Sequence, residues 1–162
     1  MSNSLEFMKT RMYLPGYMSV KTLDYRGDHL DFSFVPVEPQ VTILSSQYLT
    51  PRGMHICISQ AVYAFAEELA ERGRLGLDVK ELRDVYLKGR LKLVEMLHRM
   101  RRELETTSTL PGRLNLTKFR QGSMPVIKMD FDIGDNALCG YLVGVIAPRK
   151  VSQTNKDILR MN

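Results

Sequence analysis

Hydrophobic and polar residues alternate in the first third of the chain, which is the pattern of a strand with one buried face. Strand character begins at residues 20–23 and resumes after turn residues 26–28. The segment 30–34 then alternates strictly, and a proline closes it. Residues 41–48 begin a further extended segment. The pattern therefore predicts two neighbouring strands and a third extended stretch.

The most legible element is a long helix predicted over residues 54–72. Its first part, 54–58, is apolar nearly all round, so we expect this end to start inside the protein. Gly73 supplies a stop, and Asp78 with Glu81 has the spacing of a capping box that opens a second, shorter helix. The apolar stripe of the long helix consists of Ile58, Ala61, Val62, Phe65, Ala66 and Leu69.

The last third of the chain predicts three or four antiparallel strands. Residues 91–104 fit either a continuing helix or an alternating strand, and we expect a long strand after Gly89. Alternation is clear at 114–117 and 127–133. A turn signal then separates the second of these from a fully apolar return strand at 138–146.

Strands on both sides of one apolar helix indicate an α+β domain rather than a parallel α/β domain. This order is the layout of the hot-dog fold, in which an antiparallel sheet curls around one long buried helix. We expect a single domain over residues 1–162, with a lead-in at about 1–17 and a loose polar tail at about 149–162.

Composition fits this expectation: the 162 residues are 44% hydrophobic and 25% charged, as in an ordinary globular protein. Cys57 and Cys139 both lie in apolar runs, which favours buried thiols in a reducing compartment over a disulfide framework. Neither has a second ligand at zinc-site spacing, so no metal is expected. The apolar stretches are shorter than the roughly 20 residues that cross a bilayer, so we expect a cytoplasmic protein without a membrane span.

The formal charge of +5 favours contact with polyanions, such as a phosphate-rich cofactor or an acidic carrier protein. Much of this charge lies between residues 88 and 102, where Arg99, Arg101 and Arg102 are candidates for binding substrate phosphates. The same residues also fit an exposed strand face that discourages pairing with neighbouring molecules. Nucleic acid is less favoured, because no recognition motif accompanies the charge.

The segment 58–66 contains Gln60 followed three residues later by Tyr63, and an extended run to Tyr48 precedes it. This stretch resembles the long-chain fatty acyl-CoA thioesterases of the mycobacterial type, a hot-dog family. The resemblance covers about residues 12–75 and implies an acyl-thioester ligand, without a separate cofactor. It also implies a homo-oligomer built from dimers.

The chain departs from that family at two places. Ser59 stands where the family has an asparagine before the glutamine. No tyrosine lies near Thr42, where the family has a functional one, and Tyr13 and Tyr48 are the nearest candidates. The resemblance implies that Ser59, Gln60 and one of these tyrosines position the attacking water.

The residues themselves also suggest a site at the start of the long helix. Backbone amides at a helix start can hold a carbonyl oxygen, and Gly53, Met54 and His55 occupy that position. His55 and Ser59 are four residues apart and share a face, as a base and nucleophile would, but no third group to orient the imidazole is visible.

The polar residues further along the long helix have structural readings too. A buried Gln60 needs partners, which can be backbone groups or a bound acyl carbonyl. Tyr63 is a candidate for substrate contact and equally for core packing. The first carboxylate of the helix, Glu67, lies far from its start, and we expect it to be solvated.

Three functions remain open on the sequence. The first is hydrolysis of a fatty acyl thioester, carried by coenzyme A or an acyl carrier protein. The second is a non-catalytic acyl-binding or scaffold protein, favoured by the absence of a carboxylate early in the helix. The third is a dehydratase, which would need a histidine with an acidic partner. If the first holds, Gln60→Ala should lower turnover without unfolding the protein.

Overall fold

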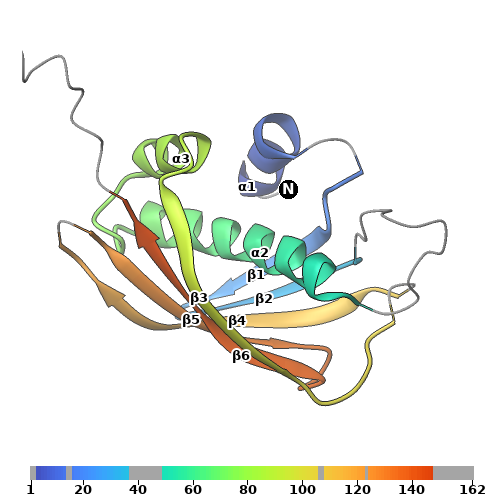
Figure 1. Ribbon diagram of the computed structural model, residues 1–162. Coiled ribbons are helices and arrows are strands. Elements are labelled where there is room, and N and C mark those ends of the chain that lie inside the picture. Colours follow the sequence, from blue (N-terminus) through green and yellow to red (C-terminus); the bar gives the residue numbers. More distant parts are fainter. Residues whose placement is uncertain (1–2, 14–15, 37–48, 106–107, 123, 148–162) are drawn as a thin grey trace, which may run out of the picture.

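The computed structural model describes residues 3–13, 16–36, 49–105, 108–122 and 124–147. Six antiparallel strands form one sheet in the order β1-β2-β4-β5-β6-β3. Figure 1 shows the sheet curving beneath the helices. The predicted α+β architecture is therefore confirmed. The strands are β1 (Val20–Arg26), β2 (His29–Phe34), β3 (Leu91–Met100), β4 (Leu110–Arg120), β5 (Val126–Ile133) and β6 (Leu138–Ile146).

The long helix α2 (Pro51–Glu71) lies across the inner face of the sheet (Figure 1). Most of its apolar stripe is buried, and the helix packs onto β1, β2 and β4. The alternating residues of β2 meet the helix: Leu30, Phe32 and Phe34 are buried, while Asp31 and Ser33 between them face outward. Helix and sheet therefore form the two layers of one core.

Two further helical segments pack beside α2. The predicted capping box opens α3 (Val79–Leu87): the Asp78 carboxylate accepts from the Glu81 amide, and the Glu81 carboxylate accepts from the Asp78 amide. The described part of the lead-in forms α1 (Asn3–Phe7) and a π-helical turn, η1 (Met8–Met12). Met8 is fully buried against the core, so the lead-in contributes to packing.

The segment 91–104, for which the sequence allowed a helix or a strand, forms the expected strand β3, which ends at Met100. It lies at the edge of the sheet and pairs along its whole length with β6. Close approach is possible because β6 carries Gly140, where a Cβ atom would overlap the Leu97 carbonyl. Most β3 side chains are exposed, including the large apolar Leu93, Val94, Leu97 and Met100.

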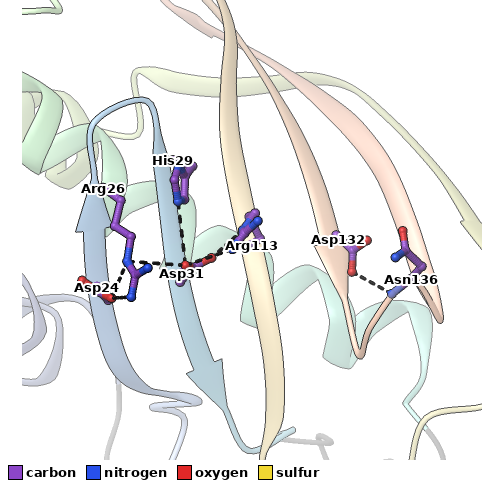
Figure 2. Close-up of polar contacts among 7 residues, drawn as sticks. All are labelled: Asp24, Arg26, His29, Asp31, Arg113, Asp132 and Asn136. Atoms are coloured by element: carbon purple, nitrogen blue, oxygen red, sulfur yellow. Dashed lines mark hydrogen bonds and ion pairs between the residues drawn. The ribbon is translucent and has the colours of Figure 1, made fainter.

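The outer face of the sheet carries a row of ion pairs between neighbouring strands (Figure 2). Arg113 of β4 binds Asp31 of β2 through two nitrogens, at 2.5 and 3.1 Å. Its hydrogen bond holds the pKa of Asp31 below the ordinary value. Arg26 binds Asp24 at 2.7 Å and approaches Asp31 at 3.9 Å. The charges are thus paired within β1 and across β1, β2 and β4, as on a solvated sheet surface.

The turn between β5 and β6 is built as predicted. Asp135 and Asn136 adopt positive φ angles of 52° and 64°, which these two residue types tolerate. The predicted extended segment at 41–48 and the predicted tail at 149–162 lie outside the described residues. No helix in the described ranges is long and apolar enough to cross a membrane.

Candidate functional site

An apolar pocket of about 190 Å³ lies between α2, α3 and the β5–β6–β3 side of the sheet. Helix α2 packs mainly on β1, β2 and β4. The pocket lies on the same face of the sheet, over the strands at the other end of the strand order, β5, β6 and β3. The lining residues come from five elements. They are Ile58, Ser59, Val62, Ala66, Leu82, Tyr86, Leu91, Leu93, Met96, Ile127, Leu142 and Gly144.

Exposure of the lining residues distinguishes the mouth of the pocket from its base. Ser59 is exposed, and Leu93 on the edge strand is 43% exposed, so these two residues lie at the mouth. Ala66 and Leu82 are almost fully buried and lie at the base. The pocket thus offers one polar side chain at its entrance and an apolar interior, as binding sites for acyl-like ligands require.

One face of α2 carries the polar residue at the mouth, Ser59, and continues toward His55. His55 lies one helical turn before Ser59 and is also exposed, so both sequence-predicted residues lie on the pocket side of the helix. Val62 and Ala66 continue the same face into the pocket. His55 itself does not line the pocket; it shares the face of Ser59 one helical turn away.

Gln60 lies on a different face of α2 and is fully buried. Its Oε1 accepts hydrogen bonds from the Ser19 and Val20 amides at 2.9 and 3.1 Å. Its Nε2 donates to the Tyr17 carbonyl at 2.6 Å. The side chain thus fastens the start of β1 to the helix, and the structure does not bring Gln60 together with Ser59.

Tyr63 and Glu67 continue the Gln60 face, and both are fully buried. The expectation that Glu67 is solvated is wrong: its Oε1 accepts from Nε of Arg83 at 2.8 Å and from Nη2 of the same residue. The second Glu67 oxygen and the Tyr63 hydroxyl make no hydrogen bond to the described part of the chain. Arg83 of α3 supplies the partner because the two helices pack side by side.

Aromatic rings surround this ion pair. Arg83 stacks over the Phe7 ring at 4.4 Å, and Phe7 stacks on Tyr63 with ring centroids 5.9 Å apart. Tyr63 in turn meets the Tyr86 ring edge-on at 4.2 Å. Tyr86 also lines the pocket, so the buried cluster lies directly behind the pocket wall. Tyr63 is separated from the pocket and does not line it.

Burial determines what the tyrosines can do. Burial raises the pKa of Tyr13, of Tyr63 and, most strongly, of Tyr86. The charge of Glu67 raises the pKa of Tyr63 further. All three phenols therefore remain protonated near neutral pH and can act as hydrogen-bond donors but not as bases. The remaining candidate tyrosine from the sequence, Tyr48, lies outside the described residues.

Two of the three backbone amides predicted to hold a carbonyl oxygen already have hydrogen-bond acceptors in the chain. The Gly53 amide donates to the Thr50 side-chain oxygen at 3.1 Å, and the Met54 amide donates to the Thr50 carbonyl at 2.9 Å. Thr50 is the N-cap of α2. The Met54 side chain is 1% exposed and packs in the core. These two amides are therefore unavailable to a substrate while the cap is formed.

The three candidate arginines lie at or beyond the end of β3, and all are exposed. Arg102 donates to the Gly134 carbonyl at 2.6 Å and so closes the turn before β6. Arg99 and Arg101 extend the charged surface nearby. The chain that follows these arginines reaches the start of α2. The amide of Leu49, just before α2, donates a hydrogen bond to the Leu104 carbonyl.

Sequence reasoning missed most of the pocket. Leu82 and Tyr86 are on a helix whose apolar face predicted only core packing, and Leu91, Leu93 and Met96 are on the ambiguous strand. No described group of three or more acidic, histidine or cysteine side chains is arranged to bind a metal ion. The signal that could have located the pocket is the helix face shared by residues 55, 59, 62 and 66.

No protein-family model matches the chain, and no curated protein sequence matches it. Solved structures do. A proposed thioesterase of Shewanella oneidensis is 14% identical with a TM-score of 0.59, over 90% of this chain and 95% of that one. The dehydratase heterocomplex ApeI:P of Xenorhabdus doucetiae is 13% identical with a TM-score of 0.52, over 93% of both chains.

Such identities establish architecture rather than activity. Both matches cover nearly the whole chain, so the likeness includes the complete sheet and the helix across it. The six-stranded antiparallel sheet around α2 agrees with them. The chain is a hot-dog fold protein.

Proposed function

We propose that the protein hydrolyses an acyl thioester, with the acyl group in the apolar pocket and the thioester carbonyl at its mouth. The observation that carries this proposal is the placement of Ser59 at the entrance of a pocket whose other lining residues, apart from the Tyr86 hydroxyl, are apolar. The fold shared with a proposed thioesterase supports the same reaction class.

The chemistry needs a water molecule aimed at the carbonyl carbon. We assign His55 as the base that accepts a proton from this water, and Ser59 as the group that orients it. The new C–O bond forms as the C–S bond breaks, and the thiolate leaves with the carrier. The released carboxylic acid and the free thiol account for the atoms of water.

The carrier would be coenzyme A or the phosphopantetheine arm of an acyl carrier protein. Arg99 and Arg101 are exposed near the start of α2 and have the charge that either phosphate group would contact. We do not assign this role to Arg102, because its guanidinium closes the turn at Gly134.

We further propose that two copies pair through the edge strand β3. Within the described sheet, this ten-residue strand has a neighbour on one side only, and its apolar Val94 and Leu97 are each 60% exposed. Leu93 at the pocket mouth lies on the same strand. A second copy would therefore complete the wall of each pocket.

Replacing Val94 and Leu97 together with lysine should convert the dimer to a monomer, because charged side chains on an edge strand oppose pairing. The mass in solution, measured by light scattering after size exclusion, checks this. Leu87→Lys is the matched control, since Leu87 is 58% exposed but lies at the end of α3 rather than on the edge strand. A wild-type mass of one chain would contradict the proposal.

Ser59→Ala and His55→Gln should each lower thioester hydrolysis, and His55→Gln by about 100-fold, the lower end of general-base effects. Release of free thiol from a panel of acyl-CoAs measures this. His29→Gln is the control, because His29 lies on the outer face of the sheet beside Asp31 (Figure 2). Equal rates for His55→Gln and His29→Gln would remove His55 from the mechanism.

A non-catalytic acyl-binding protein is the second candidate. The observation that favours it is the pocket lining, which among described residues includes no carboxylate. A dehydratase would need an acidic partner for His55, and the buried Glu67 lies on another face of α2. Binding of an acyl-CoA without thiol release from any member of the panel would select the binding protein.

A further inference from the structure

We infer that the pocket takes an acyl group of about six to eight carbons and excludes longer chains from its interior. This inference rests on the proposed acyl-binding function and names its substrate class. A long-chain substrate, which the sequence resemblance implies, would not fit. The base of the pocket, formed by Ala66, Leu82 and Tyr86, sets the limit.

Volume supplies the first argument. The pocket measures about 190 Å³. An apolar protein cavity of about 150 Å³ holds one benzene molecule, which has six carbons. Scaling by volume gives room for roughly eight carbons. Further carbons would have to remain at the mouth, against the exposed Leu93.

Burial supplies the second argument, because most of the residues around the base are almost fully buried. Leu82 is 0% exposed and Ala66 is 1% exposed. Ile127 and Leu142 close the side formed by the sheet, with 4% and 3% exposed. Tyr86 completes the base, and its ring is held edge-on against the buried Tyr63 ring.

The buried cluster of Tyr63, Phe7, Glu67 and Arg83 behind the base holds the base in place. Tyr63 is fixed between Tyr86 and Phe7, and the Glu67–Arg83 ion pair lies beside it. Moving Tyr86 aside to lengthen the pocket would disturb these ring contacts and push an apolar chain toward a buried carboxylate. The pocket therefore cannot extend in this direction at low cost.

The test measures binding, so it does not depend on turnover. Displacement of a polarity-sensitive fluorophore gives affinities for butyrate, hexanoate, octanoate, decanoate, dodecanoate and palmitate. Affinity should rise about fourfold with each added methylene group. The affinity should stop rising near octanoate, because carbons beyond the eighth would not contact the apolar lining of the pocket.

Two variants move the stopping point in opposite directions. Leu82→Ala deepens the base, so affinity should continue to rise to decanoate. Ala66→Leu fills the base, so the rise should end at hexanoate or earlier. Leu87→Ala, the same substitution at an exposed position of α3, should behave as wild type. Circular dichroism verifies folding, and Leu82→Val replaces Leu82→Ala if the larger truncation unfolds the protein.

The outcomes separate this inference from the proposed hydrolysis. A wild-type affinity that keeps rising to palmitate overturns the inference, as does a stopping point that neither base variant moves. A stopping point near octanoate that shifts in both variants supports it, even if no acyl-CoA releases free thiol. In that case the hydrolysis fails and the acyl-binding pocket stands.

Discussion

Replacing Arg83 with methionine should lower the free energy of unfolding by about 3 kcal/mol. Breaking a buried ion pair by removing one partner costs about 3–5 kcal/mol, because the remaining charge stays buried without compensation. We expect the lower end of this range, since 25% of the Arg83 side chain is exposed while Glu67 is fully buried. Urea unfolding at neutral pH measures the change.

A matched control comes from the same helix pair. Arg72→Met removes the exposed i,i+4 partner of Glu68 and should cost less than about 0.5 kcal/mol. The double variant Glu67→Met with Arg83→Met should recover much of the loss, because it leaves no buried charge. Similar losses for Arg83→Met and Arg72→Met would show that Glu67 gains solvent or another partner when Arg83 is absent.

Gln60→Ala should destabilise the protein by about 2–4 kcal/mol, because it leaves the buried amides of Ser19 and Val20 without their acceptor. This reverses the expectation from sequence, in which the variant lowers turnover but remains folded. Urea unfolding gives the global change. Amide hydrogen exchange at Ser19 and Val20 gives the local one, since both amides should lose protection in the variant.

Gln121→Ala is the control for this prediction, because Gln121 is exposed in the turn after β4. It should leave unfolding and the exchange of Ser19 and Val20 unchanged. If Gln60→Ala keeps wild-type stability but loses thiol release, then Gln60 acts on the substrate, and its backbone bonds are secondary. That result would favour the family-derived role over the positioning role.

Much of the fold could be read from local patterns. The alternation in β2 and β5 and the stripe on α2 each reflect one buried face, which is a property of consecutive residues. The capping box was also predictable, because both of its hydrogen bonds join residues three positions apart. Such signals depend on no distant part of the chain.

The site was only partly predictable, because its partners are distant in sequence. The sequence near Glu67 suggests a solvated carboxylate, because its partner Arg83 lies sixteen positions later and contacts it only in the folded chain. Gln60 meets backbone groups 40 to 43 positions earlier. A helical projection separates Gln60 from Ser59 by about 100°, yet it cannot identify what each residue faces. Only the packed structure assigns Ser59 to a pocket and Gln60 to the start of β1.

The strand order has a consequence for how the protein is made. Strand β3 is synthesised before β4 and β5, but in the described sheet its neighbour is β6. A ribosome adds roughly 5–20 residues per second, so the segment from Met100 to Ile146 takes about 2–9 seconds to emerge. During that interval β3 exposes both edges and its apolar side chains. Nascent chains should therefore be most prone to aggregation, and most dependent on chaperones, while β6 is still missing.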